Sequence, residues 1–252
     1  MLLLISPSRV MNMTPSKIDL PADKPLFQSE AELLANEMRG LELQDMAKFM
    51  EEDDHMARET LDLYRKFRTA SSKQALFAYD GKVYKAMDPA SFTPLQLDFA
   101  AQHLRIISTL YGYLRPFDVI KEYRLNFYMH YNEGNLYDFW RPRLSPVLNK
   151  DAMERGDVIL NFTALDVMKA VDLKEIRPEV SIIHVEFKDY KADKNEYISI
   201  RAYAQPAKGK LIGYIIRHTI DNPEELKSFE TDGYTYNQLL SNESEMVFTR
   251  KR

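Results

Sequence analysis

The sequence predicts an α+β or mixed α/β fold in a single domain that spans residues 1–252. Segments patterned like strands and like helices are interspersed along the chain, without an internal repeat or a regular strand–helix period. A chain of 252 residues is within the range of one domain and can bury a core without disulfides or a metal. No segment has the composition of a linker that would divide it.

The N-terminal part of the chain is predicted to be a strand followed by acidic helices. Leu2–Ile5 is a short apolar run that ends at Ser6, as a buried strand would. Ser29 and Glu32 have the spacing of a capping box, which marks the start of a helix. Helices are therefore expected over residues 29–40, 42–50 and 53–68.

A hairpin and a long core helix are predicted next. Aromatic residues in the stretch 75–87 surround Asp80-Gly81, a pair typical of hairpin turns. Thr93 and Gln96 then form a second capping box, with Pro94 at the first helical position. Apolar residues recur at spacings of three and four from Leu97 to Leu114, which predicts one buried helix that ends near Gly112 and Pro116.

The remaining elements are assigned by the same patterns. They are an extended segment at 123–131, a helix at 136–151 despite two prolines, strands at 157–162 and 180–187, a hairpin partner at 197–203, a helix at 206–217, a short helix after Asn222-Pro223 and a strand at 246–249.

The net charge of −4 hides an uneven distribution. Residues 30–62 contain 11 acidic and 3 basic side chains, so the rest of the chain carries an excess of basic residues. Such asymmetry is compatible with a basic face that attracts nucleic acid, or with ordinary solvated helices. The chain has no apolar stretch long enough to span a membrane and no secretion signal, so a cytoplasmic protein is expected.

Metal and thiol chemistry have little support in the sequence. The chain contains no cysteine, and its five histidines lack the spacing of zinc ligands. No phosphate-binding loop, nucleophile elbow or dinucleotide fingerprint is present either. We therefore expect no bound metal and no cofactor.

Several sequence blocks, in order along almost the whole chain, resemble the YaaA family of bacterial proteins. These blocks are Ile5 to Arg9, Phe77 to Tyr84, Leu110 to Asp118 with Tyr123-Arg124-Leu125, Leu136 to Trp140, Gln205 to Leu211, Gly233 to Tyr236 and Val247 to Arg250. The chain departs from the family pattern at residues 161–164 and at Gln205-Pro206. It is identified as a divergent member.

The resemblance implies a mixed sheet surrounded by helices, a positively charged cleft, and DNA binding in the response to peroxide. A helix-hairpin-helix element is also implied, but only a weak match to one occurs, at Leu110 to Pro116. The family's link to iron need not involve direct chelation. The expected partner is DNA, duplex or structured, recognised with little sequence specificity by a protein that we expect to be a monomer.

Five cations are candidates for contacts with DNA phosphates, because Arg and Lys held on a fixed frame pair with phosphate oxygens. They are Arg9, Arg115, Arg124, Lys208 and Lys210. We expect Arg9, Arg115 and Lys208 to lie in loops that share one cleft, with the acidic helices away from it. The alternative for each cation is a surface ion pair.

Four polar residues in or beside the family blocks are candidates for lining the same cleft. They are Ser6, Tyr84, Asp118 and Asn161. If they converge, the protein could instead be an enzyme that acts on a nucleobase or nucleotide held by the cations. Tyrosines at 84, 111, 123, 234 and 236 could stack on unpaired bases or lie in the core, which is the commoner role.

Overall fold

An eight-stranded mixed sheet forms the centre of the protein in a computed structural model that describes residues 1–16, 20–131, 134–164 and 166–251. Its strands are β1 (Leu2–Ile5), β3 (Leu104–Ser108), β4 (Gly112–Leu114), β8 (Val158–Asn161), β9 (Ser181–Lys191), β10 (Glu196–Ile198), β11 (Thr235–Tyr236) and β12 (Glu245–Arg250).

The strand order is β11-β12-β9-β8-β1-β3-β4, and β10 pairs with the far end of β9. The pairs β1–β3, β1–β8, β8–β9 and β9–β12 are parallel, whereas β3–β4, β9–β10 and β11–β12 are antiparallel. The predicted mixed α/β class is therefore confirmed. Every residue of β1 is at most 1% exposed, as expected of a central parallel strand.

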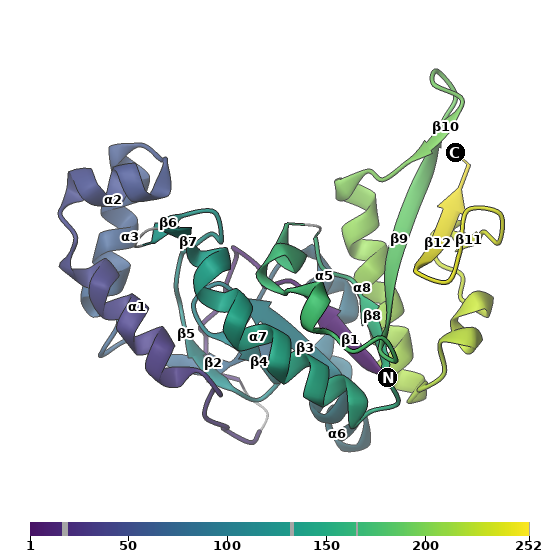
Figure 1. Ribbon diagram of the computed structural model, residues 1–252, viewed down its shortest axis with the longest axis horizontal. Helices are drawn as coiled ribbons and strands as arrows, with labels where there is room; N and C mark the ends of the chain where they lie inside the picture. The colour runs from purple at the N-terminus through teal and green to yellow at the C-terminus, as the bar shows by residue number, and fades with distance from the viewer. Residues whose placement is uncertain (17–19, 132–133, 165, 252) are drawn as a thin grey trace.

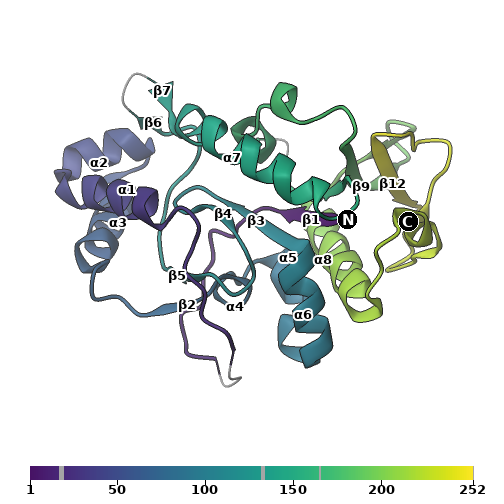
Figure 2. The same ribbon diagram turned by 60° about the horizontal axis from the view of Figure 1, so that its bottom comes forward.

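Helices cover both faces of this sheet. Figure 2 shows α7 (Leu136–Met153) above it and α5 (Lys82–Met87), α6 (Pro94–His103) and α8 (Arg201–His218) below it. Three helices form a lobe at the left of Figure 1, at the β4 side of the molecule. These are α1 (Gln28–Gly40), α2 (Leu43–Met50) and α3 (Asp54–Lys66).

Short elements complete the fold. The pair β2 (Ser72–Gln74) and β5 (Val119–Lys121) and the pair β6 (His130–Tyr131) and β7 (Gly134–Asn135) form two small sheets. The others are α4 (Ala75–Ala78) and the 3₁₀ helices η1 (Pro89–Ser91), η2 (Val167–Ala170), η3 (Leu173–Glu175) and η4 (Pro223–Ser228).

The predicted long helix after Thr93 is wrong beyond His103. Thr93 and Gln96 form the predicted capping box, but the chain turns extended at Leu104 and pairs with β1. The Arg105 guanidinium donates to the carbonyl oxygens of Ala101, Gln102 and Leu104 and so ends α6. The apolar run is buried on all sides, and such a run fits a central strand as well as a buried helix.

Gly112 allows the tight return from β3 to β4. Its φ of +66° is strained for other residues, and a Cβ there would lie 2.4 Å from the Trp140 ring.

Three other expectations need correction. Residues 75–87 form α4 and α5 rather than a hairpin, because Gly81 has an ordinary φ of −79° and begins α5 instead of a turn. Helix α1 begins after Phe27 without a side-chain cap, so Ser29 lies inside it. Helix α8 begins at Arg201, with Pro206 inside it, and therefore Lys208 is not in a loop.

Candidate functional site at the carboxyl edge of the sheet

The parallel strands β1, β3 and β8 bring three chain segments to one edge of the sheet. From β1 the chain continues to β3 on one side, whereas β8 and then β9 lie on the other side. In open α/β sheets, ligands bind outside the carboxyl ends of the strands where the order reverses in this way. The segments after Ile5, Ser108 and Asn161 therefore form the candidate site.

Ser6 connects the segments that follow β1 and β8, and Asn161 lies at the end of β8 beside this connection. The Ser6 hydroxyl accepts a hydrogen bond from the Ala164 backbone N–H at 3.0 Å. Asn161 is 2% exposed, and its Oδ1 accepts from both the backbone N–H and the hydroxyl of Thr163, at 3.0 and 2.7 Å. The structure therefore places Ser6 and Asn161 at this edge, and a third predicted polar residue, Tyr84, contacts Ser6.

His184 joins this cluster from β9. The sheet register places it beside Asn161, and Asn161 Nδ2 lies 2.9 Å from His184 Nδ1. Because Thr163 occupies Asn161 Oδ1 with two donors, the amide nitrogen faces the ring and donates to Nδ1. The neutral ring then carries its proton on Nε2, which leaves an N–H donor for a ligand.

Tyr84 supports the same edge from below the sheet but has no free hydroxyl. Its hydroxyl donates to the Ser6 carbonyl oxygen at 2.9 Å, and burial raises the pKa of this phenol well above its usual value. Nearby, the hydroxyl groups of Tyr79, Tyr123 and Ser108 form a buried chain with distances of 2.8 and 2.7 Å. Tyr84 and Tyr123 are thus core residues and do not stack on bases.

Arg9 lies just beyond Ser6 and is exposed. Its Nη2 donates to Asn126 Oδ1 at 3.2 Å, and Asn126 Nδ2 in turn donates to the Tyr128 hydroxyl at 3.0 Å. Tyr128 is 47% exposed. No acidic side chain in the described part of the chain pairs with Arg9, which sets it apart from the other predicted cations.

The other four cations have acidic partners. The N–O distances are 3.3 Å for Arg124–Glu59, 2.8 Å for Arg115–Asp118, 3.0 Å for Lys208–Glu186 and 2.6 Å for Lys210–Asp232. Glu59 belongs to α3, so the acidic lobe reaches Arg124 and is not kept apart from the predicted contacts. Lys208 is 9% exposed.

Gly209 serves helix packing rather than anion binding. A Cβ at Gly209 would lie 2.2 Å from the Val83 carbonyl oxygen of α5, because the two helix backbones approach closely there. Lys208 and Lys210 flank this contact in the middle of α8, away from the open N–H groups of a helix start.

Arg115 and Asp118 lie apart from this edge. Strand β4 runs antiparallel to β3, so Arg115 follows it toward the amino edge. Asp118 is fully buried there and accepts bonds from the backbone N–H and the guanidinium of Arg115. The structure therefore does not bring Arg9, Arg115 and Lys208 together.

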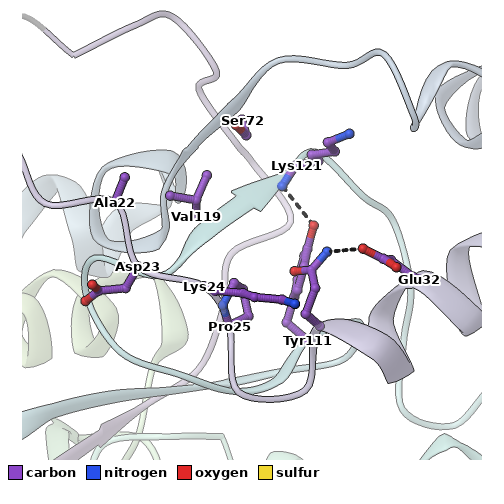
Figure 3. A pocket seen from close by; sticks show the side chains of 10 residues that line it. Ala22, Asp23, Lys24, Pro25, Glu32, Ser72, Tyr111, Val119 and Lys121 are labelled. Atoms are coloured by element: carbon purple, nitrogen blue, oxygen red, sulfur yellow. Dashed lines mark hydrogen bonds between the residues drawn. The ribbon is translucent and has the colours of Figure 1, made fainter.

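A cavity of about 370 Å³ between α1, Tyr111 and β5 offers little chemistry (Figure 3). The Tyr111 hydroxyl accepts from the Lys121 backbone N–H, and the Lys121 ammonium donates to the carbonyl oxygens of Phe67 and Arg68, just after α3. Its lining holds two lysines, Lys24 and Lys121, and two carboxylates, Asp23 and Glu32, so it carries no excess of either charge.

Within the described ranges, no three His, Asp or Glu side chains are grouped closely enough to hold a metal ion. None of the helices in those ranges is long and apolar enough to cross a membrane.

Comparison with known proteins assigns the family. The family described as Peroxide stress protein YaaA matches residues 1–240. The chain belongs to the YaaA family. This membership supports a role in the oxidative-stress response. The chain is also 35% identical to a UPF0246 protein of Parabacteroides distasonis and to one of Saccharophagus degradans, and 33% identical to one of Clostridium perfringens. Each match covers at least 99% of both chains.

Two blocks that resemble the YaaA family have structural roles near the C-terminus. Asp189 is 3% exposed. The Tyr234 hydroxyl donates to Asp189 Oδ2, and Arg250 Nε donates to Asp189 Oδ1, each at 2.6 Å. The Arg250 guanidinium also lies over the Tyr234 ring, at 4.1 Å from its centroid. Together they hold β12 on β9, so Tyr234 is a core residue.

Proposed function

We propose that this YaaA-family protein binds DNA during the oxidative-stress response, through the sugar–phosphate backbone and with little sequence specificity. The contact surface is the carboxyl edge of the sheet around Arg9, Arg124 and Tyr128. Arg9 is the observation that carries the proposal, because it is an exposed guanidinium with no acidic partner in the described ranges.

The neighbours of Arg9 fit the same role. Arg124 is two residues from Asn126, which Arg9 contacts, and its exposed pair with Glu59 is weak enough to be exchanged for a phosphate. A guanidinium that pairs with two phosphate oxygens makes no contact with a base edge and so adds no sequence specificity. The half-exposed ring of Tyr128 offers a surface on which an unpaired base can stack.

Fluorescence anisotropy with labelled DNA at several salt concentrations tests the proposal. On duplex DNA, each phosphate contact contributes a slope of about −0.9 to the logarithm of affinity against the logarithm of salt. Arg9→Gln should weaken binding to all sequences alike and reduce the slope by about 0.9. Lys174→Gln, an exposed change on η3, is the matched control. Absence of binding at low salt, or an unchanged slope in Arg9→Gln, refutes the proposal.

The cluster of Ser6, Asn161 and His184 favours a second candidate, an enzyme that acts on a nucleobase or nucleotide. An N–H donor fixed by a buried amide, at the edge where α/β enzymes bind ligands, is suited to holding a carbonyl or phosphoryl oxygen. Mass spectrometry after incubation with DNA, oxidised DNA and free nucleotides tests this candidate. A product that disappears in His184→Gln but persists in Lys174→Gln supports the enzyme candidate. If none of these substrates gives a product, the protein is not an enzyme for them.

A further inference from the structure

A second cavity, of about 400 Å³, lies at the opposite edge of the sheet. Its walls come from the segment around Lys24, the end of β4, the start of β3 and the last turns of α7. Helix α7 ends just before β8 begins, which places the cavity at the amino edge. The volume is within the range of pockets that enclose a small molecule.

The charge of the cavity is positive. Five of its lining residues are Lys or Arg and three are Asp or Glu, which leaves an excess of two positive charges. Asp151 is shared between two arginines, at 2.6 Å from Arg105 Nε and in a very short contact with Arg155 Nη1. The C-terminal end of α7 adds a negative partial charge of about one half, which reduces the excess but does not cancel it.

Some cationic groups are engaged in the fold and others are available. Arg105 is 2% exposed, and its donors are used on Asp151 and on the end of α6. By contrast, Arg155 uses only Nη1 and Arg115 uses Nε and Nη2 in hydrogen bonds within the described ranges. Lys24 makes no ion pair in those ranges. The Lys150 side chain is 79% exposed, and its ammonium lies 4.0 Å from the Glu154 carboxylate.

We propose that this amino-edge cavity binds a small organic phosphate monoester. The phosphate would lie among Lys24, Arg115, Lys150 and Arg155, and the organic part against Leu26, Val147 and the Tyr113 ring. A phosphate monoester carries roughly 1.5 to 2 negative charges at neutral pH, which is close to the positive charge that remains in the cavity. Leu26 is 57% exposed at the rim, so a bound organic group would cover it.

The cavity suits a small molecule better than a DNA groove. It is a short pocket near the α7 terminus, whereas a DNA backbone needs cations spaced along an open surface. This binding is independent of the proposed function, because Arg9 and the candidate DNA surface lie at the other edge of the sheet.

Isothermal titration with adenosine monophosphate, inorganic phosphate and adenosine at constant ionic strength tests the proposal on the full chain. Adenosine monophosphate should bind more tightly than inorganic phosphate, and adenosine should not bind. Lys24→Gln combined with Lys150→Gln should weaken binding of the monophosphate by roughly tenfold or more, through loss of charged hydrogen bonds. Both side chains are exposed, so this variant should fold.

Two controls separate this site from the DNA surface. Arg9→Gln should leave binding of the monophosphate unchanged, and the double lysine variant should leave DNA binding unchanged. The proposal fails if neither phosphate saturates the protein at millimolar concentration, or if the double variant binds the monophosphate as tightly as the wild type. Loss of DNA binding in the double variant would assign the cavity to a DNA groove and also overturn the proposal.

Discussion

Asp151 and Asp118 both face arginine, yet their pKa values shift in opposite directions. Burial would raise the pKa of Asp151, but Arg105, Tyr113 and Arg155 outweigh it, so the pKa falls below the ordinary value of 3.8. For Asp118, burial is the larger effect and raises the pKa despite the bonds from Arg115. Arginine contacts therefore lower the pKa of a buried carboxylate only where their effect is larger than that of the lost solvation.

The ionised Asp151 carboxylate should stabilise the fold at pH values above the ordinary carboxyl pKa. This contribution is lost as the pH falls through the lower pKa that Asp151 has in the folded protein. Asp151→Asn leaves Arg105 buried without its counter-charge and should cost about 3 kcal/mol at pH 7. Urea denaturation from pH 7 to pH 2.5 should show this difference shrinking below about pH 4. Asp193→Asn, in the exposed turn between β9 and β10, is the control and should change stability by less than about 0.5 kcal/mol. A difference that grows on acidification would contradict the assignment.

Sequence reasoning found part of the carboxyl-edge cluster. Ser6 and Asn161 were predicted because each follows or ends a recognisable strand within a family block or beside one. His184 was not, since only the register of β8 with β9 places it next to Asn161. Asp118 was predicted for the same cleft but lies at the other edge, because β4 reverses the direction of the chain after Gly112.

At the scale of elements, the sequence predicts best where apolar periodicity and end signals agree. This holds for β1, α2, α3, α7, β8 and β12, whose spans match the structure closely. The β9–β10 hairpin also forms, but β10 ends at Ile198, and residues 201–203 of the predicted strand belong to α8. The prediction fails where a stretch is apolar on all sides, as at Leu104–Leu114, and where a proline looks like the first residue of a helix, as at Pro206. In the structure, pairing with β1 makes the start of the apolar run a strand, β3. Helix α8 packs on α5 and begins before Pro206.

Gly209→Ala tests the close contact between α8 and α5. The added methyl group would meet the Val83 carbonyl oxygen, so the helices must separate, and we expect a loss of about 1–3 kcal/mol in unfolding free energy. Gly40→Ala is the matched control, because a Cβ there meets nothing within 4 Å and alanine favours helix. Thermal or urea unfolding of both variants measures the effect. Equal stability of the two variants would show that the contact is not tight.

In the whole molecule, the excess of acidic residues is concentrated in one region. The acidic segment forms the lobe of α1, α2 and α3 (Figure 1). This lobe contacts the candidate DNA surface through the ion pair of Glu59 with Arg124. Acidic side chains beside a phosphate-binding surface repel DNA and compete for its cations. We infer that the lobe limits affinity at this surface.

Glu59→Gln should therefore increase DNA affinity. Removing the carboxylate frees Arg124 from an exposed ion pair worth at most about 1 kcal/mol, which corresponds to an increase of up to about fivefold. Glu52→Gln removes an equal charge from the same lobe at an exposed position without an ion pair in the described ranges, and it should have a smaller effect. Anisotropy titrations at low salt compare the two. Equal gains in both variants would indicate general charge repulsion rather than release of Arg124.

The central position of β1 has a consequence for how the chain reaches its native state. Leu3 pairs with Leu104 and Leu2 with Ile159, so the neighbours of this strand lie more than 100 and more than 150 residues further along the chain. Contacts between such distant segments form slowly, since long loops must close first. During synthesis, both edges of this fully apolar strand stay unpaired until β3 has emerged, and one edge stays unpaired until β8 has emerged. Unpaired edges of this kind promote aggregation. Refolding at high protein concentration should therefore be inefficient, and chaperones that shield apolar segments should improve the yield.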